Sequence, residues 1–370
     1  MTSSGARTTV IVLFGGQSAE HEVSCISAVH VLNALDSTRY DIVPIGISQD
    51  GEWAHSDTAL KLLHSGGVEA PRALGASGQR VEASSVLQPV ELRSGPVVVL
   101  PILHGPLGED GTIQGMLELA GIPYVGSGVL GSAVAMDKAV AKMMFDAAGI
   151  PQAKWRGWRS WELDTPDARI EAARTVEAQL GWPVFVKPAN MGSSVGVTKA
   201  HDLPEFLAAL DEAMRFDDTV VVEESISGRE VEFAVLGNER PEVSLPGEVF
   251  PAKEFYDFED KYIDGNATFE IPASFAHADT LAGQEIARRA YAVLRCEGMA
   301  RVDFFFEPQR GWLVNEINTI PGFTPISMYP KLWEASGLPY AQLIDRLVDL
   351  ALQRHDRRAV HHGRARLEAR

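Results

Sequence analysis

The sequence predicts an α/β fold, and three observations point to it. A β-branched, apolar run at residues 8–16 ends on two glycines, and apolar residues then recur at helical spacing, which is typical of a strand, a turn and a helix. Short apolar runs alternate with helical patterns along most of the chain. Of the 370 residues, 45% are hydrophobic and 22% are charged, so the chain is long enough for two or three domains with a large buried core.

The first third of the chain continues this alternation. We expect a second strand at residues 40–48 and a third, buried strand at 96–105. A turn and a helix that ends near Gly121 follow, and then a fourth short strand at 122–128. Residues 55–95 are rich in Ser, Gly and Ala with weak periodicity, so they predict an irregular insertion.

A single helix is expected over residues 132–149, because Gly149 suits its C-terminal cap and Pro151 lies just beyond it. We place the first domain boundary inside this stretch, near residue 137. The segment that follows, up to residue 229, is predicted to run strand, helix, strand, loop, helix, strand.

The last segment begins near Glu230 with a strand and a long loop around residues 253–266. A helix from about Thr280 to Cys296, two paired strands, a Pro-Gly turn and a terminal helix are expected after it. The tail from Arg354 holds six arginines and few apolar residues, which predicts a solvated or frayed end.

Composition excludes several classes of protein. The net charge of −17 repels phosphate backbones, so we do not expect a nucleic-acid partner. The two cysteines, Cys25 and Cys296, form no C-x-x-C motif, which indicates free thiols in a reducing compartment. The N-terminus lacks the features of a signal peptide, and no stretch is long and apolar enough for a membrane span. We therefore predict a soluble cytoplasmic protein without a membrane partner.

Oxygen-bearing side chains mark the two paired strands near the C-terminal end. Glu316 and Asn318 are two residues apart, so they share one face of a strand. If the two strands pair through a turn at residues 308–311, Asp303 lies beside Glu316. Three oxygen ligands without Cys or His favour Mg²⁺ or Mn²⁺. A solvated strand face is the alternative, but the surrounding residues indicate a mostly buried sheet, where unpaired carboxylates would be costly.

A lysine and a glycine-serine loop suggest a phosphate site. Lys187 ends a predicted strand, and the loop that follows contains Gly192, Ser193, Ser194 and Gly196. Small residues let backbone N–H groups approach phosphate oxygens closely. The loop does not match the Walker pattern, so it indicates a flexible flap, and a plain glycine-serine hairpin is an equal alternative.

Other polar residues stand at the end of a strand. Glu223 and Glu224 end the strand, and Glu230 follows a Ser-Gly turn, so these residues can offer contacts to a base and a ribose. A polar hinge is the alternative for them, and a plain surface lysine is the alternative for Lys138.

Together these motifs resemble the D-alanine–D-alanine ligase family of the ATP-grasp superfamily. The resemblance runs from the first strand to the terminal helix and leaves out residues 55–95 and the tail. The first and last motifs are the most specific, whereas the lysine and glycine-serine elements are shared more widely. In chain order the matching segments are GGQSAEHEVS, LHGPLGEDGTIQGMLEL, MDK, VKPANMGSSVGV, EESISGREVE, FYDFEDKY, ARVDFF and NEINTIPGFTPISMYP.

The resemblance implies a three-domain ATP-grasp architecture. An N-terminal, Rossmann-like α/β pre-ATP-grasp domain would span residues 1–136. A central ATP-grasp subdomain would span 137–229, and a C-terminal subdomain with the metal and catalytic residues would span 230–370. The two ATP-grasp subdomains would be α+β in character, and relatives are commonly homodimers through the N-terminal domain.

The resemblance also implies an ATP site between the second and third domains. Lys138 and Lys187 match lysines that bind the ATP phosphates, and Ser194 lies in the matching flap at residues 191–197. Two Mg²⁺ or Mn²⁺ ions are implied, with the ligands Asp303, Glu316 and Asn318. The residues that match contacts to adenine and ribose are Glu223, Ile226, Glu230, Phe255 and Phe305.

Two D-alanine sites are implied as well. Glu20 matches the residue that receives the ammonium group of the first D-alanine, and His104 lies near that site in the family, although a structural loop histidine is the alternative. Arg301 and the backbone N–H of Gly322 match an oxyanion-stabilising pair. The remaining matches are Ser327 and Met328 for the second D-alanine, and Lys261 and Tyr262 on a mobile loop that reaches Glu20 and Ser193.

The implied reaction is the ATP-dependent ligation of two D-alanines through a D-alanyl phosphate, for peptidoglycan precursor synthesis. Two departures from relatives are Phe258, where many carry tyrosine, and Ser225, where many carry a bulkier residue. Ligation of D-alanine to D-lactate or D-serine is the alternative, and the intact Tyr262 favours a second D-alanine. A catalytically silent relative would lack part of the metal or lysine set, and this chain lacks none.

Overall fold

The N-terminal unit is a four-stranded sheet with helices around it. The computed structural model describes residues 7–64, 75, 76, 78–83, 95–250, 268–324 and 326–368. Strand β1 (Thr8–Gly15) pairs in parallel with both β2 (Tyr40–Ile47) and β4 (Val97–Ile102), because helix α1 (His21–Ala34) carries the chain across the sheet. Strand β3 (Trp53–His55) pairs with β2 in the antiparallel direction and completes the order β3-β2-β1-β4. This unit confirms the expected strand, turn and helix.

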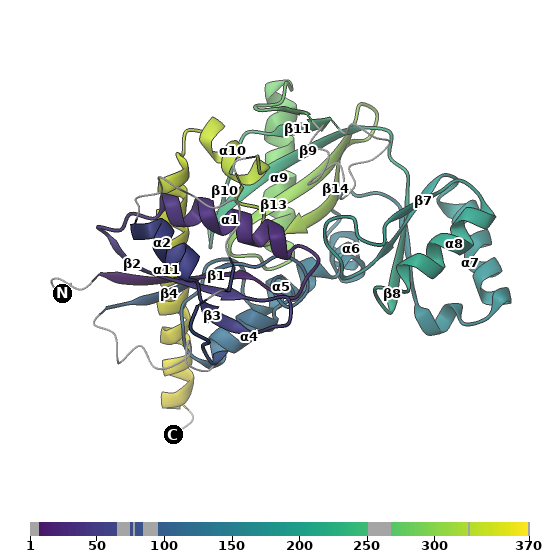
Figure 1. Cartoon of the computed structure of the whole chain (residues 1–370). Coiled ribbons are helices and arrows are strands. Elements are labelled where there is room, and N and C mark those ends of the chain that lie inside the picture. The colour runs from purple at the N-terminus through teal and green to yellow at the C-terminus, as the bar shows by residue number, and fades with distance from the viewer. Residues whose placement is uncertain are drawn as a thin grey trace.

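The middle unit is a separate antiparallel sheet that projects from one end of the molecule (Figure 1). Its strand order is β5-β8-β6-β7, and its two helices pack on the sheet through a cluster of buried alanines, valines and leucines around Phe206. The strands are β5 (Trp155–Arg159), β6 (Val184–Pro188), β7 (Thr198–Ala200) and β8 (Thr219–Glu224). The helices are α7 (Pro166–Gln179), α8 (Leu203–Ala213) and a short 3₁₀ turn, η2 (Ser160–Leu163), between β5 and α7.

The third sheet has the order β12-β11-β9-β13-β14, with β10 paired to β9 off this path. Long helix α9 (His277–Val293) covers one face and begins three residues before the expected start. An aromatic cluster on that face, which includes Phe233, Phe304 and Trp312, fixes the packing. The strands are β9 (Arg229–Gly237), β10 (Glu242–Val243), β11 (Gly247–Phe250), β12 (Thr268–Glu270), β13 (Gly298–Glu307) and β14 (Gly311–Asn318).

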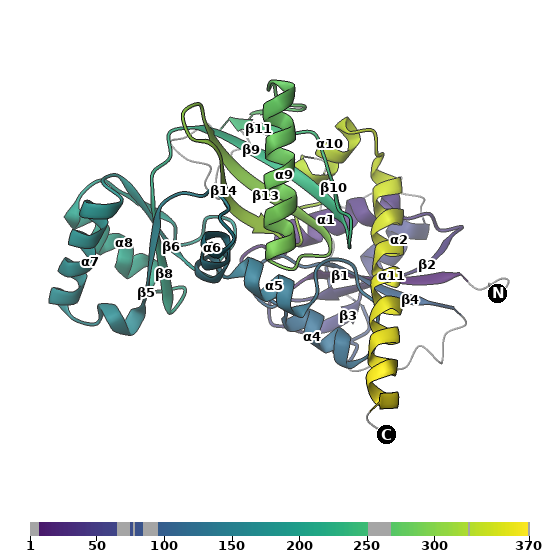
Figure 2. The same cartoon turned by 180° about the vertical axis from the view of Figure 1, so that it is seen from behind.

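Two C-terminal helices join the first and third units. Helix α10 (Met328–Ala335) packs on β9, and α11 (Tyr340–Glu368) runs along the N-terminal unit beside α1 and β4 (Figure 2). One buried cluster combines β1 and α1 with residues of β9, α10 and α11. None of the helices in the described part of the chain combines the length and apolar character needed to cross a membrane.

The structure corrects several expectations for single elements. The helix expected over 132–149 is two helices, α5 (Val129–Met136) and α6 (Lys138–Ala147), because Asp137 adopts an extended backbone and caps α6 through the N–H of Val140. Residues 122–128 contribute a single bridge between Tyr124 and Val99 instead of a strand. Part of the expected insertion forms helix α2 (Asp57–His64), and α4 (Thr112–Leu119) is the helix expected before Gly121.

The expectation of a solvated or frayed tail is wrong at the start of the tail, from Arg354 to Arg358. Helix α11 continues through this region, and the Arg354 side chain is buried. Its guanidinium donates hydrogen bonds to the carbonyl groups of Tyr124 and Gly126 in the N-terminal unit. Arg357 and Arg358 form ion pairs with Glu297. These arginines are spaced along one face of a helix, so their charges meet acidic and carbonyl partners, and Arg357 and Arg358 stay partly exposed to water.

Candidate active site

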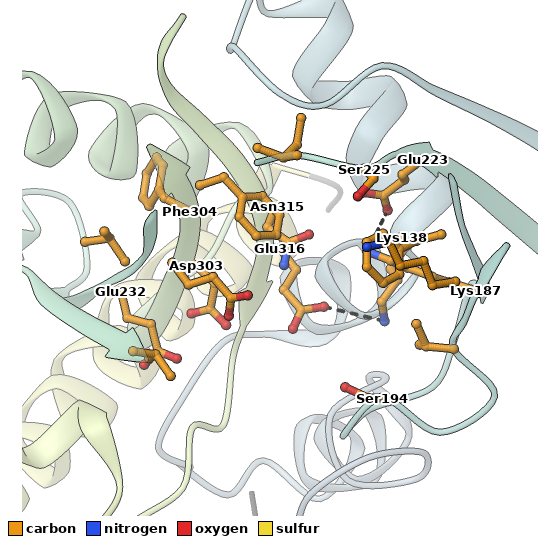
Figure 3. Close-up of a pocket in the computed structure, with 18 of the residues that line it drawn as sticks. Lys138, Lys187, Ser194, Glu223, Ser225, Glu232, Asp303, Phe304, Asn315 and Glu316 are labelled. Carbon is orange, nitrogen blue, oxygen red and sulfur yellow. Dashed lines mark ion pairs between the residues drawn. The ribbon is translucent and has the colours of Figure 1, made fainter. Parts of the chain in front are cut away.

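A cavity of about 170 Å³ lies between the middle sheet and the third sheet (Figure 3). Strands β6 and β8 and the loop after β6 supply one wall, and β9, β13 and β14 supply the other. Ten predicted site residues line this cavity besides Arg301, which is described below. They are Lys138, Lys187, Ser193, Ser194, Glu223, Ile226, Glu230, Asp303, Phe305 and Glu316.

A second cavity of about 100 Å³ adjoins the first toward the N-terminal unit. The two cavities share Ser193, Arg301 and Glu316 among their lining residues. The second one adds the predicted residues Glu20, His104, Asn318, Gly322, Ser327 and Met328. Every predicted site residue within the described ranges therefore lines one of these two adjoining cavities.

The predicted residues Phe255, Lys261 and Tyr262, and the departure at Phe258, lie outside the described residues. The other departure, Ser225, lines the larger cavity.

The strand register places the acidic residues in a row. Asp303 on β13 lies opposite Glu316 on β14, as the expected hairpin requires. Arg301 lies opposite Asn318 in the same pair of strands. Residues opposite one another in an antiparallel pair share a face of the sheet, so these four side chains project to the same side. The register shifts just after Asp303, where Asn315 is the extra residue of a β-bulge.

Ion pairs and hydrogen bonds connect this row. Arg301 donates from Nε and Nη2 to the two carboxylate oxygens of Asp303, at 2.7 and 2.6 Å. The amide of Asn318 donates to Asp303 at 3.0 Å. The Lys138 ammonium lies 3.7 Å from a Glu316 oxygen. Burial opposes the charge of Arg301, but the carboxylates of Asp303 and its neighbours raise the pKa of this guanidinium well above its usual value.

The donor set of this row fits a hard divalent cation. Asp303, Glu316 and Asn318 offer carboxylate and amide oxygens from two adjacent strands. In the part of the chain that the structure describes, no three His, Cys, Asp or Glu side chains form a closed metal cage. An ion at this position would therefore need further ligands from a bound molecule or from water, as Mg²⁺ commonly does.

A buried charge cluster lies at the other wall of the larger cavity. Glu223 is 2% exposed, and its two carboxylate oxygens lie 3.2 Å from the ammonium groups of Lys142 and Lys187. Burial opposes ionisation of Glu223, but the two lysines outweigh it and lower the pKa of this carboxyl. Burial lowers the pKa of Lys142, which is 1% exposed. Figure 3 shows Lys187 and Glu223 facing each other across this wall.

The glycine-serine loop closes over the junction of the two cavities. Ser193 and Ser194 both adopt positive φ angles, which is costly for residues with a side chain and concentrates at functional sites. The Ser193 hydroxyl donates a hydrogen bond to the Glu20 carboxylate. A Cβ atom at Gly192 would lie 2.6 Å from an oxygen of Glu20, so a larger residue there would displace the Glu20 carboxylate. The Lys138 ammonium donates to the carbonyl of Met191 at 2.6 Å.

Two buried titratable residues support the smaller cavity. His104 donates from Nδ1 to the carbonyl of Ile320 at 2.9 Å, and burial lowers the pKa of its imidazole, against the opposing charge of Glu20. Glu109 accepts hydrogen bonds from the N–H groups of Gly105 and Ile320. Burial and the nearby Glu20 raise the pKa of Glu109 to about 8.

The Pro-Gly turn after β14 is held by side chains from both ends of the chain. The N–H of Phe323 donates to the hydroxyl of Ser27 on α1, and the N–H of Thr324 donates to the hydroxyl of Ser327. A Cβ atom at Gly322 would lie 2.7 Å from the Ser327 oxygen. The turn can therefore approach Ser327 this closely only with glycine at position 322.

Four charged residues of the site have no role in the sequence analysis: Glu109, Lys142, Lys199 and Glu232. Lys142 is four residues after Lys138 in the same helix, and this spacing places both on one helix face. Glu232 is two residues after Glu230 in the same strand, and this spacing places both on one strand face. Glu109 lies in a loop, where the sequence carries no periodic signal.

Comparisons with known proteins agree with one another. The family model described as "D-ala D-ala ligase N-terminus" matches residues 9–127, and the one described as "D-ala D-ala ligase C-terminus" matches residues 144–349. A D-alanine–D-alanine ligase of Acetivibrio thermocellus is 45% identical over 369 residues, which cover 95% of this chain and 98% of the relative.

Solved structures of ligases are also similar to this chain over nearly its whole length. The D-alanine-D-alanine ligase from Coxiella burnetii has a TM-score of 0.80 and 37% identity, and the match covers 99% of both chains. The VanG D-Ala:D-Ser ligase from Enterococcus faecalis has a TM-score of 0.76 and 35% identity, and the match covers 93% of this chain and 99% of that one.

Proposed function

The chain belongs to the D-alanine–D-alanine ligase family, and we propose from this premise that it joins two D-alanines at the expense of ATP. The observation that carries the proposal is the row of Asp303, Glu316 and Asn318 beside Arg301, where the two cavities meet. The larger cavity has lysines and acids that suit a nucleotide, and the smaller one has charged groups that suit small amino acids. The ligase is proposed to work with D-alanine and ATP as its substrates.

In this proposal the larger cavity binds ATP. Lys138 and Lys187 bind the phosphates, and the strained loop with Ser193 and Ser194 covers them. Adenine and ribose contact Glu223, Ile226, Glu230 and Phe305, together with Phe255. The walls of the cavity support this orientation of ATP. The buried lysine–glutamate cluster lies on the side proposed for adenine, and the acidic row lies on the other side.

Asp303, Glu316 and Asn318 would hold two divalent cations, Mg²⁺ or Mn²⁺, in the loaded enzyme. The chemistry supplied by such ions is charge neutralisation of the phosphate oxygens. The protein's own contribution is to carry these ligands on two hydrogen-bonded strands, whose register also fixes the backbone position of Arg301 beside them.

The proposed reaction has two steps. The carboxylate of the first D-alanine attacks the γ-phosphorus of ATP, so that a carbon–oxygen–phosphorus linkage forms and ADP leaves. The amine of the second D-alanine then attacks the acyl carbon, loses a proton, and displaces phosphate. Negative charge develops on the carbonyl oxygen in this second step, and the Arg301 guanidinium and the Gly322 N–H are proposed to stabilise it.

The smaller cavity positions the two amino acids in this scheme. Glu20 would accept the ammonium group of the first D-alanine, next to His104, and Ser327 with Met328 would bind the carboxylate of the second. Tyr262 and Lys261 would complete the site by closing over Glu20 and Ser193. Closure excludes water, which would otherwise hydrolyse the acyl phosphate.

The proposal also covers the organisation of the enzyme. We divide the chain into domains at residues 1–136, 137–229 and 230–370. On the family resemblance, we propose that the enzyme is a cytoplasmic homodimer and that its dipeptide serves peptidoglycan precursor synthesis. Analytical ultracentrifugation tests the dimer, and a monomeric protein at micromolar concentration would contradict it.

The decisive experiment incubates the purified protein with ATP, Mg²⁺ and D-alanine and follows ADP release together with product mass. We expect ADP and D-alanyl-D-alanine in equal amounts. ADP release that does not depend on D-alanine, with no dipeptide formed, would show ATP turnover but contradict D-alanine as the substrate. A complete lack of ADP release with D-amino or D-hydroxy acids would overturn the ligase activity itself.

A second candidate is ligation of D-alanine to D-serine or D-lactate. The likeness to a D-Ala:D-Ser ligase at 35% identity is the observation that keeps it in view. Competition between D-alanine and D-serine or D-lactate at equal concentrations distinguishes the candidates by product mass. We expect D-alanyl-D-alanine to dominate, and a mainly mixed product would favour the second candidate.

A further inference from the structure

Glu232 is an acidic residue of the site to which the proposed reaction gives no task. It lies on β9, directly opposite Asp303, while Glu316 lies opposite Asp303 on the other side of β13. Figure 3 shows Glu232, Asp303 and Glu316 following one another across the three strands. Glu232 is only 7% exposed and lines both cavities. The sheet therefore carries three carboxylates in one row.

Such a row is unfavourable without a cation, because directly opposite side chains in a sheet are roughly 5 Å apart and like charges repel. Arg301 supplies this cation. It precedes Asp303 by two residues, so it projects from the same face of β13. Its guanidinium makes the bidentate contact with Asp303, and its Nε atom also lies 3.0 Å from a Glu232 oxygen.

Under the proposed function, Asp303 has two competing partners. Both of its oxygens contact Arg301 in this structure, and the same oxygens would have to turn toward a divalent cation in the loaded site. Glu232 is not subject to this competition to the same degree, because β13 separates it from Glu316 and Asn318 on β14. Its contact with Arg301 can therefore persist when Asp303 turns away.

We propose that Glu232 is a positioning residue that holds the Arg301 guanidinium at the junction of the two cavities during the reaction. The inference rests on the proposed ligase function and adds a residue to it. Glu232 acts through Arg301 and does not touch the reacting atoms. A guanidinium displaced by about 1 Å would lose much of its effect on the developing oxyanion, and displacements of this size cost on the order of 100-fold in rate.

The test compares Glu232→Gln, which keeps the shape but removes the charge, with Glu232→Asp, which keeps the charge on a shorter side chain. Glu248→Gln is the matched control. Glu248 is a buried acid on β11 of the same sheet, and Arg229 donates to it from Nε at 2.8 Å. Glu248 lines neither cavity, so its substitution removes a similar ion pair and reports the structural effect alone.

We expect Glu232→Gln to lower kcat by about 10- to 100-fold, and Glu232→Asp to recover part of that loss. The KM for ATP and the Mg²⁺ concentration for half-maximal activity should stay within about twofold of the wild type. Calorimetric titration with ADP and Mg²⁺, which needs no turnover, should give an unchanged Kd. Glu248→Gln should lower Tm while leaving kcat within about twofold.

A double-mutant cycle with Arg301→Lys tests whether Glu232 acts through Arg301. In the Arg301→Lys background, we expect Glu232→Gln to reduce kcat by no more than about twofold, because the group that it positions has already been replaced. Fully multiplicative effects of the two substitutions would overturn the proposal.

Two further outcomes would overturn it. A folded Glu232→Gln protein with kcat within twofold of the wild type would show that Asp303 alone positions Arg301. A rise of tenfold or more in the Mg²⁺ requirement, with kcat restored at high Mg²⁺, would make Glu232 a metal ligand instead.

If Glu232→Gln does not fold, the test uses Glu232→Asp alone. A wild-type kcat in Glu232→Asp would show that close contact between residue 232 and Arg301 is not required. A wild-type protein that forms no dipeptide would instead contradict the proposed function, so the two failures are distinguishable.

Discussion

The charged residues of this site depend on their ion-pair partners, because burial leaves them little contact with water. Glu223 is the clearest case, since two lysines contact one carboxylate that is only 2% exposed. Removing one partner of a buried ion pair is far more costly than removing an exposed one. The residue-scale predictions below use this asymmetry.

Lys142→Met should raise the KM for ATP by about tenfold or more and affect kcat less. Methionine keeps the volume but removes one of the two cations that hold Glu223, so the proposed adenine contact becomes displaced. Steady-state kinetics at saturating D-alanine measures the effect. An unchanged KM for ATP in this variant would refute the role.

Asp303→Asn should reduce kcat by at least about 100-fold at saturating Mg²⁺ and leave the protein folded. The substitution keeps the shape and one oxygen but removes the charge that Arg301 and the proposed cations require. Circular dichroism checks the fold, and Asp211→Asn, in an exposed ion pair with Arg169, is the control. Wild-type kcat in Asp303→Asn would contradict the ligand role.

His104→Gln should make stability less sensitive to acid. Burial lowers the pKa of His104 in the folded protein below the ordinary value of 6.5. Below pH 6.5 the unfolded chain therefore binds a proton that the folded protein does not, and wild-type stability falls as the pH decreases. The Tm difference between the wild type and the variant, measured from pH 7.5 to 5, should shift in favour of the variant. A difference independent of pH would contradict this assignment.

At the scale of elements, two irregularities shape the site. The β-bulge at Asn315 shifts the register just after Asp303, so that Glu316 lies opposite Asp303 and Asn318 lies opposite Arg301. The break between α5 and α6 places Lys138 at the first position of α6, where its amide donates to the carbonyl of Ala189 at 3.0 Å. Both features fix where a charged side chain enters the larger cavity.

Asp137→Ala should cost about 1 kcal/mol of stability, which is typical of the loss of an N-cap. The Asp137 carboxylate accepts from the N–H of Val140 at 2.9 Å, and nothing in alanine replaces it. Because Lys138 follows the cap directly, the KM for ATP should also rise severalfold. Asp137→Ser, which retains a capping oxygen, should recover both the stability and the KM for ATP. If serine recovers the stability but not the KM, the cap does not determine the position of Lys138.

At the scale of the whole molecule, α11 ties the C-terminal end of the chain to the N-terminal unit. Arg354, which is 3% exposed, donates to two carbonyl groups in residues 124–126 and stacks 4.2 Å from the ring centre of Tyr124. The smaller cavity needs this attachment, because Glu20 and His104 come from the first unit while Arg301 and Ser327 come from the last.

Arg354→Met should lower the free energy of unfolding by about 2–3 kcal/mol, because two buried carbonyl groups lose charged donors. Thermal and urea unfolding measure the effect. Arg346→Gln on the same helix is the control. It breaks an exposed ion pair with Glu242 of β10 and should change stability by less than about 1 kcal/mol. Equal losses in the two variants would contradict a special role for the buried arginine.

Local patterns were sufficient for much of the fold. Strand β1 follows from its continuous β-branched, apolar run, which is buried on both faces. Helix α1 and the hairpin of β13 and β14 follow from the spacing of their residues. Asp303 faces Glu316 as expected, but the turn between the strands is one residue shorter than expected, and the extra residue Asn315 restores this pairing. The break at Asp137 and the burial of Arg354 did not follow, since a cap inside a helical pattern and a distant carbonyl partner have no periodic signature.

The sequence by itself determined the chemistry of this protein: its family, the residue types of its acidic row, and the lysines and small residues beside them. These properties are local, because side-chain spacing within one strand or loop sets which groups share a face. Only the tertiary structure decided how the groups are balanced. Glu232 lies beside Asp303 because β9 pairs with β13, and Lys142 reaches Glu223 because α6 packs on β8. Such contacts join distant parts of the chain, and their energies depend on burial that no single stretch of sequence reveals.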